Sequence, residues 1–185
     1  LVKAIPKGYT LTQVILTHCH IDHCGGVAAL FRLCEKHKIP RPTLSYHSEG
    51  SILAQNIDMV ADMYNIPSGQ YENSPKFDSD LAPLKEIMFG DITLRLLNTP
   101  GHAPGHVSLF IDAPDITLTG AFSTTVNNRP VLIAGDALFK GSIGRTDLPG
   151  GDHELLLERI RTQLFTLPDS TLVLTGHGDN TTIGT

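Results

Sequence analysis

The stretch Thr17-His18-Cys19-His20-Ile21-Asp22-His23, with Gly25-Gly26 directly behind it, carries the strongest structural and chemical signal in this chain of 185 residues. It follows the apolar run Val14-Ile15-Leu16. A short apolar run that is closed by polar residues and then glycines predicts a buried strand ending in a loop. One histidine in such a loop would be an ordinary loop residue. Three imidazoles and a carboxylate at one strand end instead indicate a metal site.

The spacing inside this stretch divides the metal-binding side chains into two pairs. His18 and His20 lie two residues apart, so in extended backbone they point to the same side and can share one metal ion. Asp22 and His23 follow where the chain begins to turn, so they can face a second metal position nearby. Neutral imidazole and carboxylate are ligands that both zinc and non-haem iron accept. The stretch therefore predicts part of a centre whose other ligands come from elsewhere in the chain.

Three later clusters repeat this form, with a metal-binding residue directly after a predicted strand. His102 follows Thr99-Pro100-Gly101, whose proline and glycine force a rigid turn, and it is the predicted third ligand of the first metal. Asp136 follows Gly135 and is the candidate for bridging both metals through its two carboxylate oxygens. His177, between two glycines, is assigned to the second metal together with the Asp22–His23 pair.

The remaining sequence alternates predicted strands and helices. A turn at Gly90-Asp91 joins two strands into a hairpin, and Ser48 and Asp152 are the predicted N-caps of the two later helices. His106 opens a strand and is expected to make a structural hydrogen bond. Strands are predicted at 43–47, 84–89, 92–97, 107–111, 131–134 and 171–174, helices at 27–38, 49–65 and 152–167, a long exposed loop at 68–83 and an irregular hairpin at 115–130.

Composition and charge restrict the class of protein. A chain of this length with 41% hydrophobic residues can bury one core, so a single domain over 1–185 is expected. The net charge of −5 and the lack of a Lys/Arg cluster argue against a nucleic-acid partner, and no apolar run approaches the length of a membrane span.

The cysteine count favours reduced thiols. Three cysteines, Cys19, Cys24 and Cys34, are too few and too odd in number for a disulfide framework, so a cytoplasmic location is expected. Cys19 and Cys24 flank the histidine cluster but are expected to be small buried hydrophobic residues.

The Gly-rich segment 139–151 holds one arginine and one aspartate. It lacks the Gly-Lys-Ser/Thr ending of a phosphate-binding P-loop, so nucleotide binding is not supported. Arg145 could bind a substrate carboxylate through two parallel hydrogen bonds. It could equally pair with Asp147 and organise the loop, and the sequence leaves both roles open.

The quoted motifs resemble the metallo-β-lactamase superfamily in residue type and order over nearly the whole chain. Within it, Gly135-Asp136-Ala137-Leu138-Phe139, the segment 141–147 and Gly176-His177-Gly178 with Thr181-Thr182-Ile183-Gly184 resemble the short, bacterial-type glyoxalase II-like hydrolases. This resemblance implies an αββα sandwich of two mixed β-sheets with helices on the outer faces. It also implies the metal-ligand set His18, His20, His102, Asp22, His23, His177 and the bridging Asp136.

The resemblance further implies a dinuclear hydrolase that cleaves a small-molecule thioester, such as a hydroxyacyl-glutathione. Two divalent ions, zinc first with iron or manganese as alternatives, would hold a bridging hydroxide, and Asp22 would orient it. Family members have several strands before the histidine motif, and long glyoxalase II enzymes carry a helical extension after it. We therefore expect this chain to be a domain trimmed at both ends, without the N-terminal strands.

Two other functions remain open. Thr17-His18-Cys19-His20 and Gly144-Arg145-Thr146-Asp147 also resemble persulfide dioxygenases, which would use one iron held by two histidines and an aspartate. Gly25-Gly26 and Gly176-His177-Gly178 fit the hydrolases better. The third interpretation is a non-catalytic, truncated metal-binding domain. Hydrolysis of β-lactams is the least favoured activity, because the segment 141–147 resembles the thioesterase branch.

Overall fold

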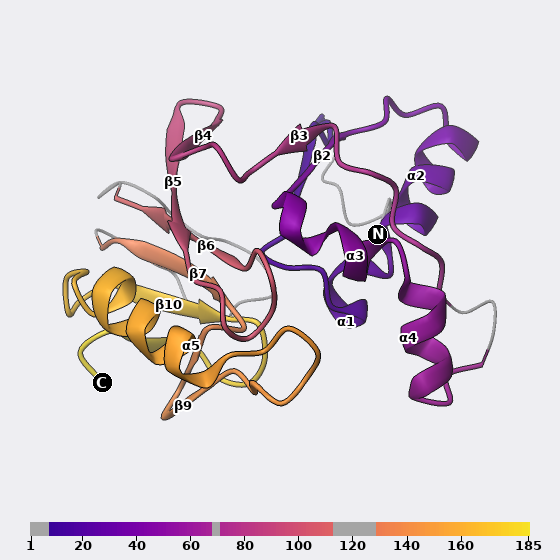
Figure 1. Ribbon diagram of the computed structural model, residues 1–185. Helices are drawn as coiled ribbons and strands as arrows, with labels where there is room; N and C mark the ends of the chain where they lie inside the picture. Colours follow the sequence, from indigo (N-terminus) through magenta and orange to yellow (C-terminus); the bar gives the residue numbers. More distant parts are fainter. Residues whose placement is uncertain (1–7, 68–70, 113–128) are drawn as a thin grey trace. The chain divides into compact units, whose positions relative to one another are not determined.

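A computed structural model describes residues 8–67, 71–112 and 129–185 (Figure 1). The chain divides into two compact units, Leu1–Pro83 and Leu84–Thr185, each with its own sheet. The single domain expected over 1–185 stays a prediction. The hairpin predicted at 115–130 lies almost entirely outside the described residues. Among the helices that are described, none is long and apolar enough to cross a membrane.

The N-terminal unit is built on a small sheet whose described strands are all parallel, in the order β1-β2-β3. The strands predicted around residue 15 and at 43–47 and the helix predicted at 27–38 are confirmed. The elements are β1 (Gln13–Ile15), α1 (Ile21–Cys24), α2 (Val27–Lys36), β2 (Thr43–Tyr46), α3 (Ser51–Ala54), α4 (Ile57–Met63) and β3 (Ser79–Asp80), with a 3-10 turn at Ser48–Gly50.

One core holds this unit together. Helix α2 presents Val27, Leu30 and Cys34 on its buried face, at the spacing that an amphipathic helix gives. The core gathers residues from strand ends and helices: Leu16, Cys19, Cys24, Val27, Leu44, Tyr46, Ala54 and Ile57. Because Cys19 and Cys24 are in this core, they anchor the loop that carries the histidine cluster.

The prediction of a single helix at 49–65 is wrong. The segment forms a 3-10 turn and two short helices, and His47, not Ser48, caps it by accepting the Glu49 N–H. The break has a tertiary cause. The Ala54 carbonyl accepts a hydrogen bond from the Ser74 N–H at 2.7 Å, and the Asp58 N–H is bonded to Asn73 Oδ1 at 3.3 Å. Those two groups would have bonded one another in a continuous helix.

The predicted loop at 68–83 is confirmed as irregular over 71–78, while Ser79–Asp80 adds a short strand beside β2. Two aromatic residues of this segment, Tyr71 and Phe77, pack against the core of the unit. The Phe77 ring lies edge-on to Tyr46 with the ring centres 5.0 Å apart. These contacts tether the segment to the core of the unit.

The described residues of the C-terminal unit form a mixed six-stranded sheet in the order β11-β10-β7-β6-β5-β4, in which β7 and β10 pair in parallel and the other neighbours are antiparallel. All strands predicted in this unit and the Gly90-Asp91 hairpin are confirmed. The elements are β4 (Glu86–Phe89), β5 (Ile92–Asn98), β6 (Val107–Ile111), β7 (Val131–Gly135), β8 (Leu138–Phe139), β9 (Ser142–Ile143), α5 (His153–Arg159), β10 (Leu172–Thr175) and β11 (Thr181–Thr182), with a π-helical turn at Ile160–Leu164.

Helix α5 covers one face of this sheet (Figure 1). It begins as predicted, because the Asp152 carboxylate accepts the Leu155 N–H at 3.0 Å. Beyond Arg159 the helix widens into the π-helical turn, so the predicted helical span ends at about residue 164. The core beneath it comprises Leu97, Phe110, Leu132, Ala134, Ala137, Leu138, Leu156, Ile160, Leu164, Leu167 and Val173. This packing holds the strand ends that carry the later clusters.

Candidate metal centre

In the N-terminal unit the histidine cluster forms at the end of β1 and the start of α1. His20 is the residue before α1 and has extended backbone, and its carbonyl accepts the His23 and Cys24 N–H groups. This sharp change from strand to helix turns the side chains towards one another. The ring of His18 lies 4.9 Å from that of His20 and 4.0 Å from that of His23, centre to centre.

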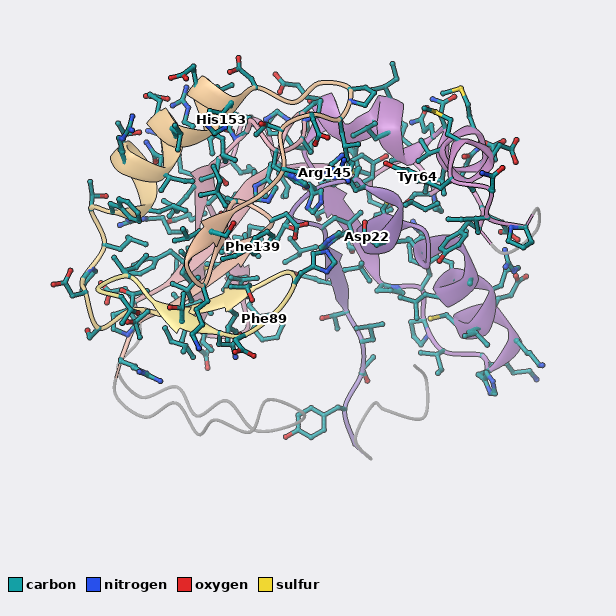
Figure 2. All side chains as sticks on the ribbon, turned by 90° about the horizontal axis from the view of Figure 1, so that it is seen from below. Asp22, Tyr64, Phe89, Phe139, Arg145 and His153 are labelled. Carbon is teal, nitrogen blue, oxygen red and sulfur yellow. The ribbon has the colours of Figure 1, made fainter. Side chains whose placement is uncertain are left out.

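Asp22 adds a carboxylate to this cluster. Asp22 Oδ2 lies 3.5 Å from His23 Nε2, and the Asp22 side chain is about half exposed, whereas His18 is buried. Asp22 lies on α1, as labelled in Figure 2. All four predicted N-terminal ligands are therefore grouped over one turn of backbone.

The two flanking cysteines have the structural role that was expected. Cys19 and Cys24 are buried free thiols, and Cys24 Sγ donates to the Cys19 carbonyl at 3.1 Å. Burial raises the pKa of both thiols, that of Cys24 to about 12, so both stay protonated at neutral pH. Both thiols pack in the core of the unit and so anchor the loop.

The glycine after α1 is required by a close contact. A Cβ on Gly25 would lie 2.5 Å from the Ile21 carbonyl oxygen and 2.6 Å from the Tyr71 ring. The ring of Tyr71 therefore packs directly against the backbone that follows the histidine cluster. A larger residue at this position would displace either the turn or the ring.

In the C-terminal unit the structure brings His102, Asp136 and His177 together around one carboxylate oxygen. Asp136 Oδ2 lies 3.6 Å from His102 Nε2 and 3.3 Å from His177 Nε2. Asp136 and His102 are buried, and the His177 side chain is about half exposed. Both histidines therefore approach the same oxygen of Asp136. The bridging of two metals by Asp136 stays a prediction.

Hydrogen bonding orients His102 for metal binding. Its Nδ1 donates to the Arg145 carbonyl at 2.8 Å, because a carbonyl oxygen can only accept. The neutral ring then presents an unprotonated Nε2 towards Asp136. A histidine whose second nitrogen is held by a backbone carbonyl is the usual form of a metal ligand. The sequence did not single out this carbonyl, because no side-chain type marks it.

Two glycines pack tightly around Asp136. A Cβ on Gly176 would lie 2.0 Å from Asp136 Oδ1, and a Cβ on Gly144 would lie 1.9 Å from the Asp136 carbonyl oxygen and 3.0 Å from the His102 ring. Only glycine allows these approaches. The sequence singled out Gly176 as part of a strand-end motif, but its steric role requires the fold. Together these contacts leave Asp136 little freedom to move.

Arg145 makes the internal contact that the sequence left open. Its Nε and one terminal nitrogen donate to the two oxygens of Asp147 at 2.7 and 2.8 Å. The arginine lowers the pKa of the Asp147 carboxyl to about 2, so the pair is charged throughout the neutral range. Arg145 lies on the loop between β9 and α5, where Figure 2 labels it. Binding of a substrate carboxylate by this arginine stays a prediction.

The donor types in each unit fit divalent metal ions of the zinc and iron class. The N-terminal unit offers three imidazoles and one carboxylate, and the C-terminal unit offers two imidazoles and one carboxylate. These are nitrogen and oxygen ligands without thiolates, which zinc, iron and manganese sites all use. The tautomer of His102 and the glycine contacts of Asp136 agree with such a role.

Comparison with known proteins extends this result to the whole chain. The family model described as the metallo-beta-lactamase superfamily matches residues 6–123 and 120–177. The probable metallo-hydrolase YqgX of Bacillus subtilis is 37% identical over 96% of this chain and 73% of its own length. The hydroxyacylglutathione hydrolase GloC of Haemophilus influenzae is 31% identical over 94% of this chain and 72% of its own length.

Solved structures agree with these matches. BLEG-1, a B3 metallo-beta-lactamase, has a TM-score of 0.70 at 33% identity and covers 94% of this chain and 72% of its own. TTHA1623 in a di-iron-bound form has a TM-score of 0.67 at 29% identity, over 93% and 72%. ETHE1 from Myxococcus xanthus has a TM-score of 0.60 at 26% identity, over 96% and 60%. With its strand-end histidine and aspartate clusters and its mixed α/β fold, the chain belongs to the metallo-β-lactamase superfamily.

Proposed function

We propose that this protein is a dinuclear metal-dependent hydrolase that cleaves a small-molecule thioester, such as a hydroxyacyl-glutathione. One observation carries the proposal. Asp136 Oδ2 faces both His102 and His177, the two histidines that the spacing argument assigned to different metals. A carboxylate oxygen between ligands of two metals is the arrangement that a bridging ligand requires. The name of the GloC relative supports the choice of a thioester.

The complete ligand set is part of this proposal. His18, His20 and His102 would hold the first metal, Asp22, His23 and His177 the second, and Asp136 would bridge them. The grouping of the four N-terminal donors around one turn and of the three C-terminal donors around one oxygen supports a role in metal binding for all seven. We propose zinc first, with iron or manganese as alternatives. The di-iron form of TTHA1623 keeps iron open.

The side chains of the chain would then share the work of hydrolysis. The metal ions would supply hydroxide at neutral pH, because a metal lowers the pKa of its bound water to about 7. Asp22, half exposed beside His23, would accept a hydrogen bond from the attacking oxygen and orient it. A thiol has a pKa of about 8.5, so the leaving thiolate requires no strong general acid. The described site accordingly needs no further acidic residue to expel the thiol.

One experiment tests the function as a whole. We expect protein purified without chelators to contain two metal ions per chain by elemental mass spectrometry and to hydrolyse hydroxyacyl-glutathione thioesters. The assay panel should include simple esters and a β-lactam, because BLEG-1 is described as a B3 metallo-beta-lactamase. Two metals with turnover of the β-lactam alone, or a folded two-metal protein without any turnover, would overturn the thioester assignment.

A second candidate function is an iron-dependent persulfide dioxygenase. The similarity to ETHE1 from Myxococcus xanthus supports keeping it. Such an enzyme would use two histidines and one aspartate of the same set to hold a single iron. One iron per chain, with oxygen uptake in the presence of a persulfide, would favour this function over the hydrolase.

Arg145 is our candidate for binding the polar end of the substrate. We expect Arg145→Ala to raise KM about tenfold, since a hydrogen bond to a charged group contributes about 1.5–3 kcal/mol, while kcat stays within about twofold. Asp147→Asn is the matched control. It weakens the internal ion pair and leaves the arginine available, so KM should stay equal or fall. A KM that rises equally in both variants would show that the ion pair only organises the loop.

A further inference from the structure

A buried chain of hydrogen bonds ends on both sides of Gly135, directly before Asp136. Three fully buried polar residues form it: Thr99 at the start of the His102 turn, His106 at its end, and Ser108 on β6. The Asp136 N–H donates to His106 Nε2 at 3.0 Å, and Ser108 Oγ donates to the Ala134 carbonyl at 3.1 Å. These two contacts lie two residues apart in the sequence.

The donors and acceptors allow one direction only along this chain. Because His106 Nε2 accepts a hydrogen bond, it carries no proton, and the proton of the neutral ring is on Nδ1. Nδ1 therefore donates to Thr99 Oγ1 at 2.9 Å. Thr99 Oγ1 then donates to Ser108 Oγ at 2.9 Å, since the Ser108 proton is used for the Ala134 carbonyl. This single arrangement satisfies all four of these hydrogen bonds.

We infer that His106 is a positioning residue, which acts through the backbone of Asp136. Gly135 has φ +54°, so the chain turns sharply at the end of β7, and the hydrogen bonds hold the carbonyl before the turn and the N–H after it. His106 thereby sets the direction in which the Asp136 carboxylate leaves the turn. The same residues form the loop that presents His102, because the Thr99 N–H donates to the His106 carbonyl at 3.0 Å.

The hydrogen-bond chain of Thr99, His106 and Ser108 also couples two predicted metal ligands within one unit. A shift of His106 would move the Asp136 backbone and the His102 turn together. Asp136 has little room to move, since Gly176 lies close to its carboxylate and Gly144 lies close to its backbone carbonyl. Loss of the His106 acceptor would leave the Asp136 N–H buried without its partner, and the turn would have to relax. This inference rests on the proposed function in assigning Asp136 to the metal bridge.

Matched variants of His106 test the inference through zinc binding. We expect His106→Leu to weaken the binding of zinc ions by about 10- to 100-fold in a competition titration with a chelator, the range found for groups that orient metal ligands. His106→Leu should also lower kcat by about 10- to 100-fold, while KM stays within about twofold of the wild-type value. His106→Gln can place its side-chain oxygen near the position of Nε2, so it should recover most of the affinity. Recovery of fold without recovery of zinc affinity in His106→Gln would overturn the inference.

The control separates positioning from general loss of stability. Ile160→Ala removes buried side-chain atoms from the core of the same unit, and Ile160 takes no part in the hydrogen bonds among Thr99, His106, Ser108 and Asp136. It should lower the unfolding midpoint about as much as His106→Leu and leave zinc affinity within about twofold. Equal loss of zinc affinity in both variants would show that His106 acts only through stability.

A spectroscopic measurement reads His106 independently of metal or activity. Nitrogen-15 NMR of the wild-type chain should show the His106 ring as the neutral tautomer with its proton on Nδ1. An imidazolium, or the tautomer with its proton on Nε2, would overturn the inference. If the wild type binds no zinc, iron or manganese, the proposed function fails, while this spectrum still decides the role of His106.

Discussion

Asp136→Ala is expected to abolish the two-metal centre and to lower kcat/KM at least about a thousandfold, which corresponds to about 4 kcal/mol of transition-state stabilisation. The reason is that the Asp136 carboxylate is buried and places one oxygen 3.6 Å from His102 Nε2 and 3.3 Å from His177 Nε2. Removing it takes away the shared negative charge between two metal positions. Elemental mass spectrometry and steady-state thioester hydrolysis would measure both effects.

A neutral replacement distinguishes charge from volume at this site. Asp136→Asn keeps the shape of the side chain, so it should fold as the wild type does yet lose nearly as much activity as Asp136→Ala. Asp112→Asn makes the same chemical change at an exposed position of the same unit and should leave turnover within about twofold. Retention of two metals and normal turnover in Asp136→Ala would remove Asp136 from the site.

Gly101→Ala is expected to destabilise the C-terminal unit by about 3–5 kcal/mol, the combined cost of a backbone conformation unsuited to alanine and of overpacking. Gly101 has φ +123°, and its Cβ would lie 2.5 Å from the Leu156 backbone nitrogen and 2.7 Å from the Asp152 carbonyl oxygen. Both are atoms at the start of α5, which cannot move away as a flexible side chain could. A loss of this size is a large part of the stability of a typical domain.

A second glycine provides the control for this prediction. Gly141 also has a positive φ, +69°, but a Cβ there would meet no atom within 4 Å. Gly141→Ala should therefore cost only about 1–2 kcal/mol, the conformational penalty alone. Urea unfolding followed by far-ultraviolet circular dichroism would compare the two variants. Equal midpoints would mean that the Gly101 turn can move away from α5, contrary to the structure.

Local patterns predicted most of the secondary structure because strands, turns and helix caps depend mainly on residues that are close in the sequence. The alternation around Gly90-Asp91 specified the hairpin, and the Asp152 cap specified the start of α5. The helix predicted at 49–65 failed because Ser74 and Asn73, distant in sequence, bond to the backbone at the point where the helix breaks. No pattern within 49–65 contains that information.

The same distinction applies to the candidate site. The residue types at the strand ends indicated His102, Asp136 and His177 as ligands, because clusters of imidazole and carboxylate groups are rare and chemically specific. They could not show that His102 and His177 approach one oxygen of Asp136, since this depends on how β5, β6, β7 and β10 pair. His106 was expected to make a structural hydrogen bond, which is confirmed, but its partner Asp136 is thirty residues away.

By itself, the sequence determined which residue types are available for metal binding, where strands and turns alternate, and the family to which the chain belongs. These properties depend on the spacing of residues that are close in the sequence, so they can be read without the fold. Tertiary structure alone decided the tautomers of His102 and His106, the approach of His102 and His177 to one oxygen of Asp136, and the need for glycine at Gly144 and Gly176. Each depends on distances between atoms that only folding brings together, and hydrogen bonds and steric contacts act only at such short range.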